Sequence, residues 1–333
     1  MRRLPVFFLI DVSESMVGDP ITNVNTGIRK IISTLKSNPM ALETAYISII
    51  IFAGKAKLVS PLTEILQFSP PELFIGGGTA LGNGMNCLMD EMEKQVQKTT
   101  YEQKGDWKPL IFVFTDGAPT DNVTPAITRW NSKFKTKANL IAISIGKQAD
   151  TTVLAKFTDN VIIFDNATAE SYLTFFEWVS ASIETKSMNI AAGSDDFQLP
   201  QMDQMILQKE DIYNPKSDHD ERVAILLSRC QQTKKPYLIK YLKRSANKYI
   251  TDGAYTISED YFGLTDEGKS STIGTEDIDT VPSCPECGQT AIAYCGCGHL
   301  FCIGHEGKNT CPWCNHEVIV EYSGGFDISK TQG

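Results

Sequence analysis

Seven of the nine cysteines of this 333-residue chain lie between Cys284 and Cys314. Three of the four histidines, His299, His305 and His316, lie in or beside the same window. A segment this short is too small to fold on a hydrophobic core of its own, so such crowding predicts a unit held together by metal. The rest of the chain must build a separate core, and 42% apolar residues provide ample material for one.

The spacing of these residues indicates zinc. Two Cys-x2-Cys pairs flank a Cys/His centre, and a structural zinc ion takes four tetrahedral Cys or His ligands. A cross-braced arrangement groups Cys284, Cys287, Cys302 and His305 in one site and Cys297, His299, Cys311 and Cys314 in the other. Cys295 and His316 are then spare ligands, although His316 could replace His305. We therefore predict two structural Zn²⁺ ions, with other pairings left open.

Apolar runs alternate with amphipathic segments through the first 186 residues. Apolar or β-branched runs at 5–11, 46–52, 110–114, 140–145 and 161–164 predict strands, and 56–61 predicts a hairpin partner. Apolar residues at helical spacing within 21–35, 81–96, 126–134 and 172–183 predict helices. Strands that alternate with helices imply an α/β fold with a doubly wound, mostly parallel sheet covered on both faces.

The remainder divides by composition into three parts. Residues 187–280 read as a connecting segment with short strands at Val223–Leu227 and Tyr237–Leu242, followed by an acidic, flexible linker from Leu264 to Thr280. Residues 281–322 form the Cys/His module, closed by a strand at Glu317–Tyr322, and 323–333 form a tail. The basic residues between Arg229 and Lys248 are interleaved with tyrosines, which suits either a solvated strand face or nucleic-acid contact, and the solvated face is favoured.

The net charge of −9 argues against binding to nucleic acid or to an anionic membrane. No stretch is apolar enough to span a membrane, so we expect a cytoplasmic protein. Residues 1–218 contain no histidine, which argues against Ser–His–Asp or Cys–His catalysis in the larger part of the chain.

Polar side chains follow three of the predicted strands or precede their helices. Asp11, Ser13 and Ser15 follow the first strand, Thr79 follows a run of three glycines, and Asp116 follows the strand at 110–114. Such loops meet at the carboxyl edge of a doubly wound sheet. Two carboxylates and three hydroxyls suit Mg²⁺ or Mn²⁺, and an incompletely neutralised ion would attract a partner's carboxylate. The alternative is that the three hydroxyls only cap helices.

These five residues resemble the metal-ion-dependent adhesion site of von Willebrand factor type A domains, over about residues 4–186. The resemblance implies a six-stranded sheet with one antiparallel edge, at 56–61, and a binding domain rather than an enzyme. A haloacid-dehalogenase-type phosphatase also places an aspartate after its first strand. That chemistry needs a second carboxylate where this chain has Ser13.

The Cys/His module resembles a RING or related treble-clef module. Together with the segment that contains Leu227–Cys230 and Lys235–Tyr237, the chain resembles the bacterial TerY-type proteins of tellurite-resistance and stress operons. This resemblance implies a non-enzymatic scaffold of a phospho-signalling system, with a protein kinase and a metal-dependent protein phosphatase as partners. A RING-type ubiquitin ligase and a chelatase-like subunit of an ATPase complex are the alternatives.

Overall fold

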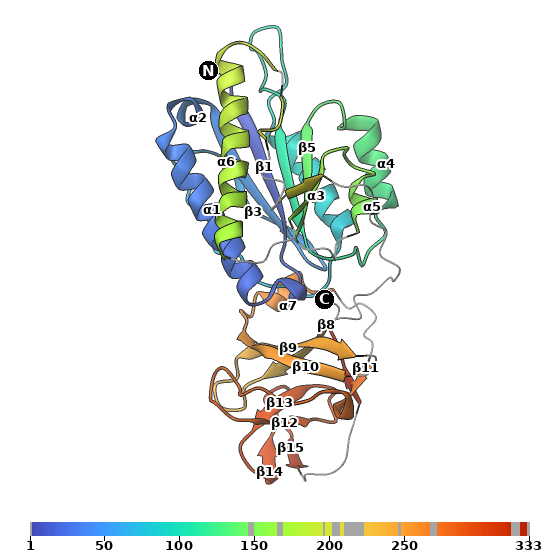
Figure 1. The fold of residues 1–333 in the computed structure, drawn as a ribbon. Coiled ribbons are helices and arrows are strands. Elements are labelled where there is room, and N and C mark those ends of the chain that lie inside the picture. Colours follow the sequence, from blue (N-terminus) through green and yellow to red (C-terminus); the bar gives the residue numbers. More distant parts are fainter. Residues whose placement is uncertain are drawn as a thin grey trace.

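The computed structural model describes residues 2–145, 150–164, 169–195, 197–201, 207–209, 223–245, 248–266, 272–320 and 327–331. The chain forms two units stacked end to end (Figure 1). The amino-terminal unit is a sheet flanked by helices, and the carboxyl-terminal unit is built mainly of strands. The second unit lies at the edge of the first where the parallel strands end, next to the loop after the first strand.

The sheet of the first unit contains the six strands that the sequence predicts. Its order is β3-β2-β1-β4-β5-β6-β7. The strands are β1 (Leu4–Asp11), β2 (Ala45–Phe52), β3 (Ala56–Glu64), β4 (Leu110–Thr115), β5 (Asn139–Ile145), β6 (Val161–Phe164) and β7 (Leu207–Lys209). All neighbours are parallel except β3 and β7, the two edge strands. The antiparallel edge at 56–61 is therefore confirmed, and β7 is a short addition from the predicted connecting segment.

Helices cover both faces of this sheet. They are η1 (Glu14–Met16), α1 (Asp19–Ser37), α2 (Pro39–Thr44), α3 (Leu81–Gln95), α4 (Thr124–Lys133), α5 (Thr151–Leu154) and α6 (Ala169–Ala191). Phe8 packs with α1 and α6 in one core, whereas its neighbour Phe7 packs with α3 and α4 in the other. Successive side chains of a strand point to opposite faces, so a strand covered on both sides is apolar throughout, as β1 is. None of the described helices combines the length and hydropathy of a membrane span.

The second unit centres on a five-stranded sheet of order β10-β9-β8-β13-β12. Its strands are β8 (Val223–Arg229), β9 (Pro236–Ser245), β10 (Lys248–Thr256), β12 (Ala291–Tyr294) and β13 (Leu300–Ile303). Two ribbons accompany it, β14 (Gly307–Thr310) with β15 (Glu317–Val320), and β11 (Thr272–Gly274) with β16 (Asp327–Ser329). Two short helices, α7 (Tyr261–Leu264) and η2 (Thr275–Asp277), complete the unit.

This sheet crosses the boundary predicted at residue 280. Strand β8 belongs to the predicted connecting segment and β13 to the predicted Cys/His module, yet they pair in parallel through Leu300 and Ser228. The five-stranded sheet therefore joins the two predicted segments, and one hydrophobic cluster contains residues of both, such as Leu226 and Leu300.

Two smaller expectations also change. The predicted flexible linker contains β11 and η2, and the predicted tail contains β16, which pairs with β11. Residues 267–271 of the linker, and residues 321 and 322 of the predicted closing strand, lie outside the described residues.

Candidate metal sites

Asp11 lies buried at the end of β1, where its carboxylate is held by two neighbours. Its Oδ1 accepts a hydrogen bond from the Ser13 backbone N–H at 2.9 Å, and its Oδ2 accepts one from the Thr115 hydroxyl at 2.6 Å. Thr115 is the last residue of β4, the strand next to β1. The topology of the sheet thus places Asp11 beside the loop that carries Asp116, as the sequence predicts.

Three of the other predicted residues lie in contact around this carboxylate. The Ser13 and Ser15 hydroxyl oxygens are 3.0 Å apart, and Ser15 donates a hydrogen bond to Asp116 Oδ1 at 2.9 Å. The Ser13 hydroxyl is 3.5 Å from the same oxygen. We call Asp11, Ser13, Ser15, Asp116 and Thr79 the sheet-edge site.

Thr79 lies against the loop that follows Asp116. Its backbone N–H donates to the Thr120 hydroxyl at 3.0 Å, and the Thr120 N–H donates to the Thr79 carbonyl at 2.9 Å. A side-chain carbon added to Gly117 would lie 3.5 Å from the Thr79 hydroxyl oxygen. That hydroxyl is buried and has no hydrogen-bond partner among the described residues. Leaving a buried hydroxyl unpaired costs free energy, so this orphaned oxygen fits the position of a metal ligand.

The helix-capping alternative does not fit this geometry. Ser13 precedes η1, but its side chain makes no capping hydrogen bond. Ala80, not Thr79, precedes α3, and the free N–H groups of Gly82 and Asn83 donate instead to the Asp121 carboxylate at 3.0 and 2.9 Å. The hydroxyls of the sheet-edge site are therefore available for another ligand.

The buried Asp11 carboxylate and the half-buried Asp116 carboxylate repel one another. Burial, together with the negative charge of Asp116, raises the pKa of the Asp11 carboxyl from 3.8 to about 7. A bound cation removes this penalty by pairing with the ionised form. The donor set, all oxygen with two carboxylates, is that of a hard divalent ion.

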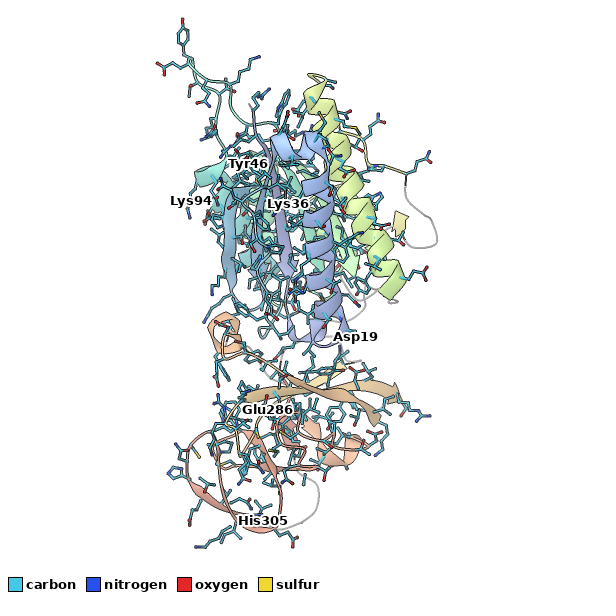
Figure 2. All side chains as sticks on the ribbon, turned by 90° about the vertical axis from the view of Figure 1, so that its left-hand side faces the viewer. Asp19, Lys36, Tyr46, Lys94, Glu286 and His305 are labelled. Carbon is cyan, nitrogen blue, oxygen red and sulfur yellow. The ribbon has the colours of Figure 1, made fainter. Side chains whose placement is uncertain are left out.

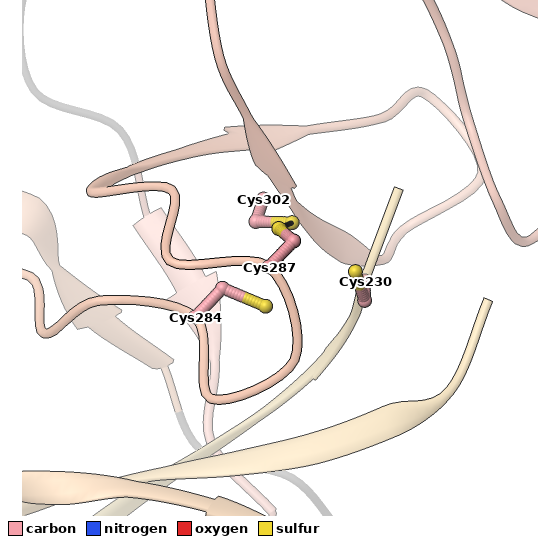
Figure 3. A group of neighbouring side chains, drawn as sticks. All are labelled: Cys230, Cys284, Cys287 and Cys302. Carbon is pink, nitrogen blue, oxygen red and sulfur yellow. Dashed lines mark hydrogen bonds between the residues drawn. The ribbon is translucent and has the colours of Figure 1, made fainter. Parts of the chain in front are cut away.

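The first of two cysteine groups lies between the sheet and the loops of the second unit. It contains Cys230, Cys284, Cys287 and Cys302, and their sulfur atoms all lie within 4.8 Å of one another (Figure 3). The predicted set shares three of these cysteines but has His305 as its fourth member. Figure 2 shows His305 at the far end of the second unit, away from the first. Cys230, at the end of β8, takes that place.

The second group contains Cys295, Cys297, Cys311 and Cys314, whose sulfur atoms also lie within 4.8 Å of one another. The predicted set has His299 in place of Cys295. The His299 ring instead stacks on Trp313, with ring centroids 4.5 Å apart, and its Nδ1 lies 3.1 Å from the Cys297 carbonyl oxygen. Cys295 is thus not a spare residue, and the described histidines of the module, His316 included, belong to neither group.

Cys230 lies in a local turn of the same kind as those at Cys284 and Cys311. The backbone N–H four residues after Cys230, Cys284 and Cys311 donates to the carbonyl of that cysteine in each case. The residue at this position has a positive φ each time: Lys234, Gly288 and Asn315. Cys230 therefore starts a knuckle like the others, with Thr233 where they have their second cysteine. Counting only Cys-x2-Cys pairs misses it.

Comparison with known families agrees with the two-unit fold. The von Willebrand factor type A domain matches residues 6–177, and the TerY-C metal binding domain matches residues 220–333. The second match spans both Cys230 and the cysteine-rich segment. No curated protein matches the chain.

Several solved structures are similar to part of this chain. Proximal thread matrix protein 1 from the mussel byssus has 16% identity and a TM-score of 0.41, over 55% of this chain and 48% of that one. The pilus adhesin SpaC from Lactobacillus rhamnosus GG has 14% identity and a TM-score of 0.44, over 56% of this chain and 30% of that one. A von Willebrand factor type A protein from Catenulispora acidiphila has 12% identity and a TM-score of 0.42, over 79% and 68%. The chain spans less than half of the length of the first two.

Proposed function

Because the chain belongs to the von Willebrand factor type A domain family and also carries a TerY-C metal binding domain, we propose that it is a non-enzymatic, metal-dependent protein-interaction protein. The observation that carries this proposal is the meeting of three loops at the sheet-edge site, where the buried Thr79 hydroxyl lacks a partner among the described residues. An oxygen-lined site that lacks a histidine suits ion-mediated contact better than acid–base catalysis.

The residues of the sheet-edge site would contact Mg²⁺ in two ways. Ser13, Ser15 and Thr79 would bind through their hydroxyl oxygens, and Asp11 and Asp116 would act through water. When bound, the ion supplies an open coordination position for a carboxylate of a partner protein. Asp11 is fixed for this role by Ser13 N and the Thr115 hydroxyl, so it needs little rearrangement.

The two cysteine groups would each hold one Zn²⁺ in a structural role. Four thiolates complete the tetrahedral shell of zinc and leave no open position for a substrate. All of their members except the exposed Cys297 are buried or half-buried, which supports a structural role.

We further propose that the partners are a protein kinase and a metal-dependent protein phosphatase of a bacterial tellurite-resistance or stress phospho-signalling system. The support is the combination of the two matched domains in one chain. The contact on the partner would be an exposed aspartate or glutamate.

The test is an affinity pull-down from the native host with the full chain as bait, followed by mass spectrometry. It is run with Mg²⁺ and with Mg²⁺ omitted, because a strong chelator would also strip ions from the cysteine groups. A Thr79→Ala bait removes one ligand, and a Thr128→Ala bait, altered on the exposed face of α4, is the matched control. The proposal expects a kinase and a phosphatase retained only with Mg²⁺, by the wild type and the control. Equal retention under all conditions contradicts it, and recovery of an ATPase or a ubiquitin-conjugating enzyme instead favours the alternatives.

A further inference from the structure

A lysine of the second unit is buried against the first loop of the sheet-edge site. Lys240 lies on β9 and is only 8% exposed. Its Nζ donates hydrogen bonds to the Ser15 carbonyl at 2.9 Å and to the Val17 carbonyl at 3.3 Å. The expectation of a solvated basic strand face is therefore wrong for this residue, because the first unit covers it.

A second contact reaches into the same loop. Glu14 lies between Ser13 and Ser15, and its side chain turns away from them to accept a hydrogen bond from the hydroxyl of Tyr261 on α7. Both side chains are buried, with Glu14 at 0% and Tyr261 at 1% exposure. The loop that carries two hydroxyls of the site is thus fixed from the second unit at both its backbone and a side chain.

A third set of contacts holds the loop that leads to Thr79. The Thr265 hydroxyl accepts a hydrogen bond from the Gly77 N–H at 2.9 Å and donates one to the Tyr261 carbonyl at 2.7 Å. The approach is so close that a side-chain carbon on Gly77 would lie 2.7 Å from Thr265 Cγ2. A larger residue at position 77 would therefore collide with Thr265, which explains the glycine at this contact between the two units.

The loop that carries Asp116 is held differently. In this loop Asp121 accepts from Gly82 and Asn83, and Thr120 bonds to Thr79, all within the first unit. Two of the three loops of the sheet-edge site therefore take part of their support from residues more than 180 positions further along the chain.

From these contacts we propose that the sheet-edge site is a composite of both units, in which Lys240, Tyr261 and Thr265 are positioning residues for the ion. The inference rests on the proposed function, since it concerns the same ion. Its physical basis is preorganisation: loops already fixed in the binding geometry lose less entropy when the ion binds. The second unit therefore sets the affinity of the site and is more than an appended domain.

Lys240 separates positioning from simple electrostatics. Its ammonium group lies next to the loop that carries Ser13 and Ser15, so it repels a divalent cation there. If its charge were all that mattered, Lys240→Met would tighten cation binding. If it positions the loop, Lys240→Met weakens binding, since the Ser15 and Val17 carbonyls lose their shared donor. The two explanations predict opposite signs.

The experiment titrates the full chain with Mn²⁺ alone and follows free Mn²⁺ by electron paramagnetic resonance. The variants are Lys240→Met, Tyr261→Phe and Thr265→Val. The matched controls are Arg244→Met, on an exposed part of the same strand, and Tyr241→Phe, whose side chain is buried in the core of the second unit. Zinc content per chain is measured on every variant, and a retained content shows that the second unit is still folded.

We expect each of the three variants to bind Mn²⁺ about three- to tenfold more weakly, the loss that one or two net hydrogen bonds represent, with the controls unchanged. Unchanged affinity in all three variants, or tighter binding by Lys240→Met, overturns the inference while leaving the proposed function intact. Thr79→Ala is titrated in the same way. If the wild type does not bind Mn²⁺, or if Thr79→Ala binds it as tightly as the wild type, both the inference and the proposed function are overturned.

Discussion

The hydroxyl of Tyr261 donates a hydrogen bond to the carboxyl group of Glu14, although the two residues are 247 positions apart. The bond is buried, and burial raises the pKa of the Glu14 carboxyl to about 8. A buried carboxyl group without a partner is costly, so the bond ties the docking of α7 to the loop that carries Ser13 and Ser15. The Tyr261 hydroxyl thus pairs with Glu14 Oε1, whereas Glu14 Oε2 has no hydrogen-bond partner among the described residues.

This pairing predicts that one substitution is rescued by a second. Tyr261→Phe leaves a Glu14 oxygen buried and unpaired, which lowers the free energy of unfolding by about 1–3 kcal/mol. Adding Glu14→Leu removes that orphaned group, so the double variant is more stable than Tyr261→Phe alone. Urea unfolding of the four proteins of this cycle, with Tyr255→Phe as a control for loss of a tyrosine hydroxyl, measures the effect. Purely additive changes would contradict it.

The orphaned hydroxyl of Thr79 predicts a variant that is harmless until the ion is added. Without divalent ions, Thr79→Val is at least as stable as the wild type, because it replaces an unpaired buried hydroxyl with a methyl group of the same shape. When Mg²⁺ is added, the melting temperature rises only for the wild type, because an ion that binds only the folded state stabilises that state. Thr158→Val, which removes a hydroxyl bonded at 2.6 Å to the Leu140 carbonyl, loses stability with or without Mg²⁺. A Mg²⁺-dependent shift retained in Thr79→Val removes this residue from the site.

The raised pKa of Asp11 gives the metal-free protein a pH dependence of defined sign. Between its unfolded value of 3.8 and its folded value of about 7, the folded state holds a proton that the unfolded state has released. Stability is therefore largest below the unfolded pKa and falls as the pH rises through this window. Urea unfolding without divalent ions, compared between about pH 5 and about pH 7 for the wild type and Asp11→Asn, isolates the contribution of this carboxyl. The wild type should lose more stability than the variant, and added Mg²⁺ should reduce that loss; equal slopes would mean that Asp11 does not titrate in this range.

Periodicity is why so much of the first unit could be predicted. Strand β1 is apolar throughout because it is covered on both faces, and the position of Asp11 at its end follows directly. The parallel neighbour β4 then brings Asp116 to the same edge. In a doubly wound sheet, the order of strand and loop in the sequence is enough to bring such side chains together.

Contacts that form only when distant parts of the chain pack together could not be predicted from the order of strands and loops. A lysine within a strand resembles a solvated residue, and only the first unit, packed on β9, makes Lys240 a buried donor. Cys230 is likewise distant from the other cysteines in sequence, and its place in the first group depends on the pairing of β8 with β13. Both residues lie in the segment interpreted as a connector, where no regular period marked a core.

The cysteine groups provide the last prediction, because they distinguish the cysteines that lie together from the histidines that spacing alone suggested. Cys230→Ser removes one of four thiolates from the first group, so the zinc content falls from about two ions per chain to about one and the second unit loses stability. His305→Ala and His299→Ala retain both ions, although His299→Ala loses its stacking on Trp313. Cys87→Ser, in the half-buried part of α3 and remote from both groups, is the matched control. Zinc is measured by elemental analysis after gel filtration and stability by thermal unfolding. Loss of an ion from His305→Ala, together with retention of both ions by Cys230→Ser, would reverse the assignment. The reason is that a tetrahedral site releases its metal when a ligand is removed and keeps it when the removed residue is not a ligand.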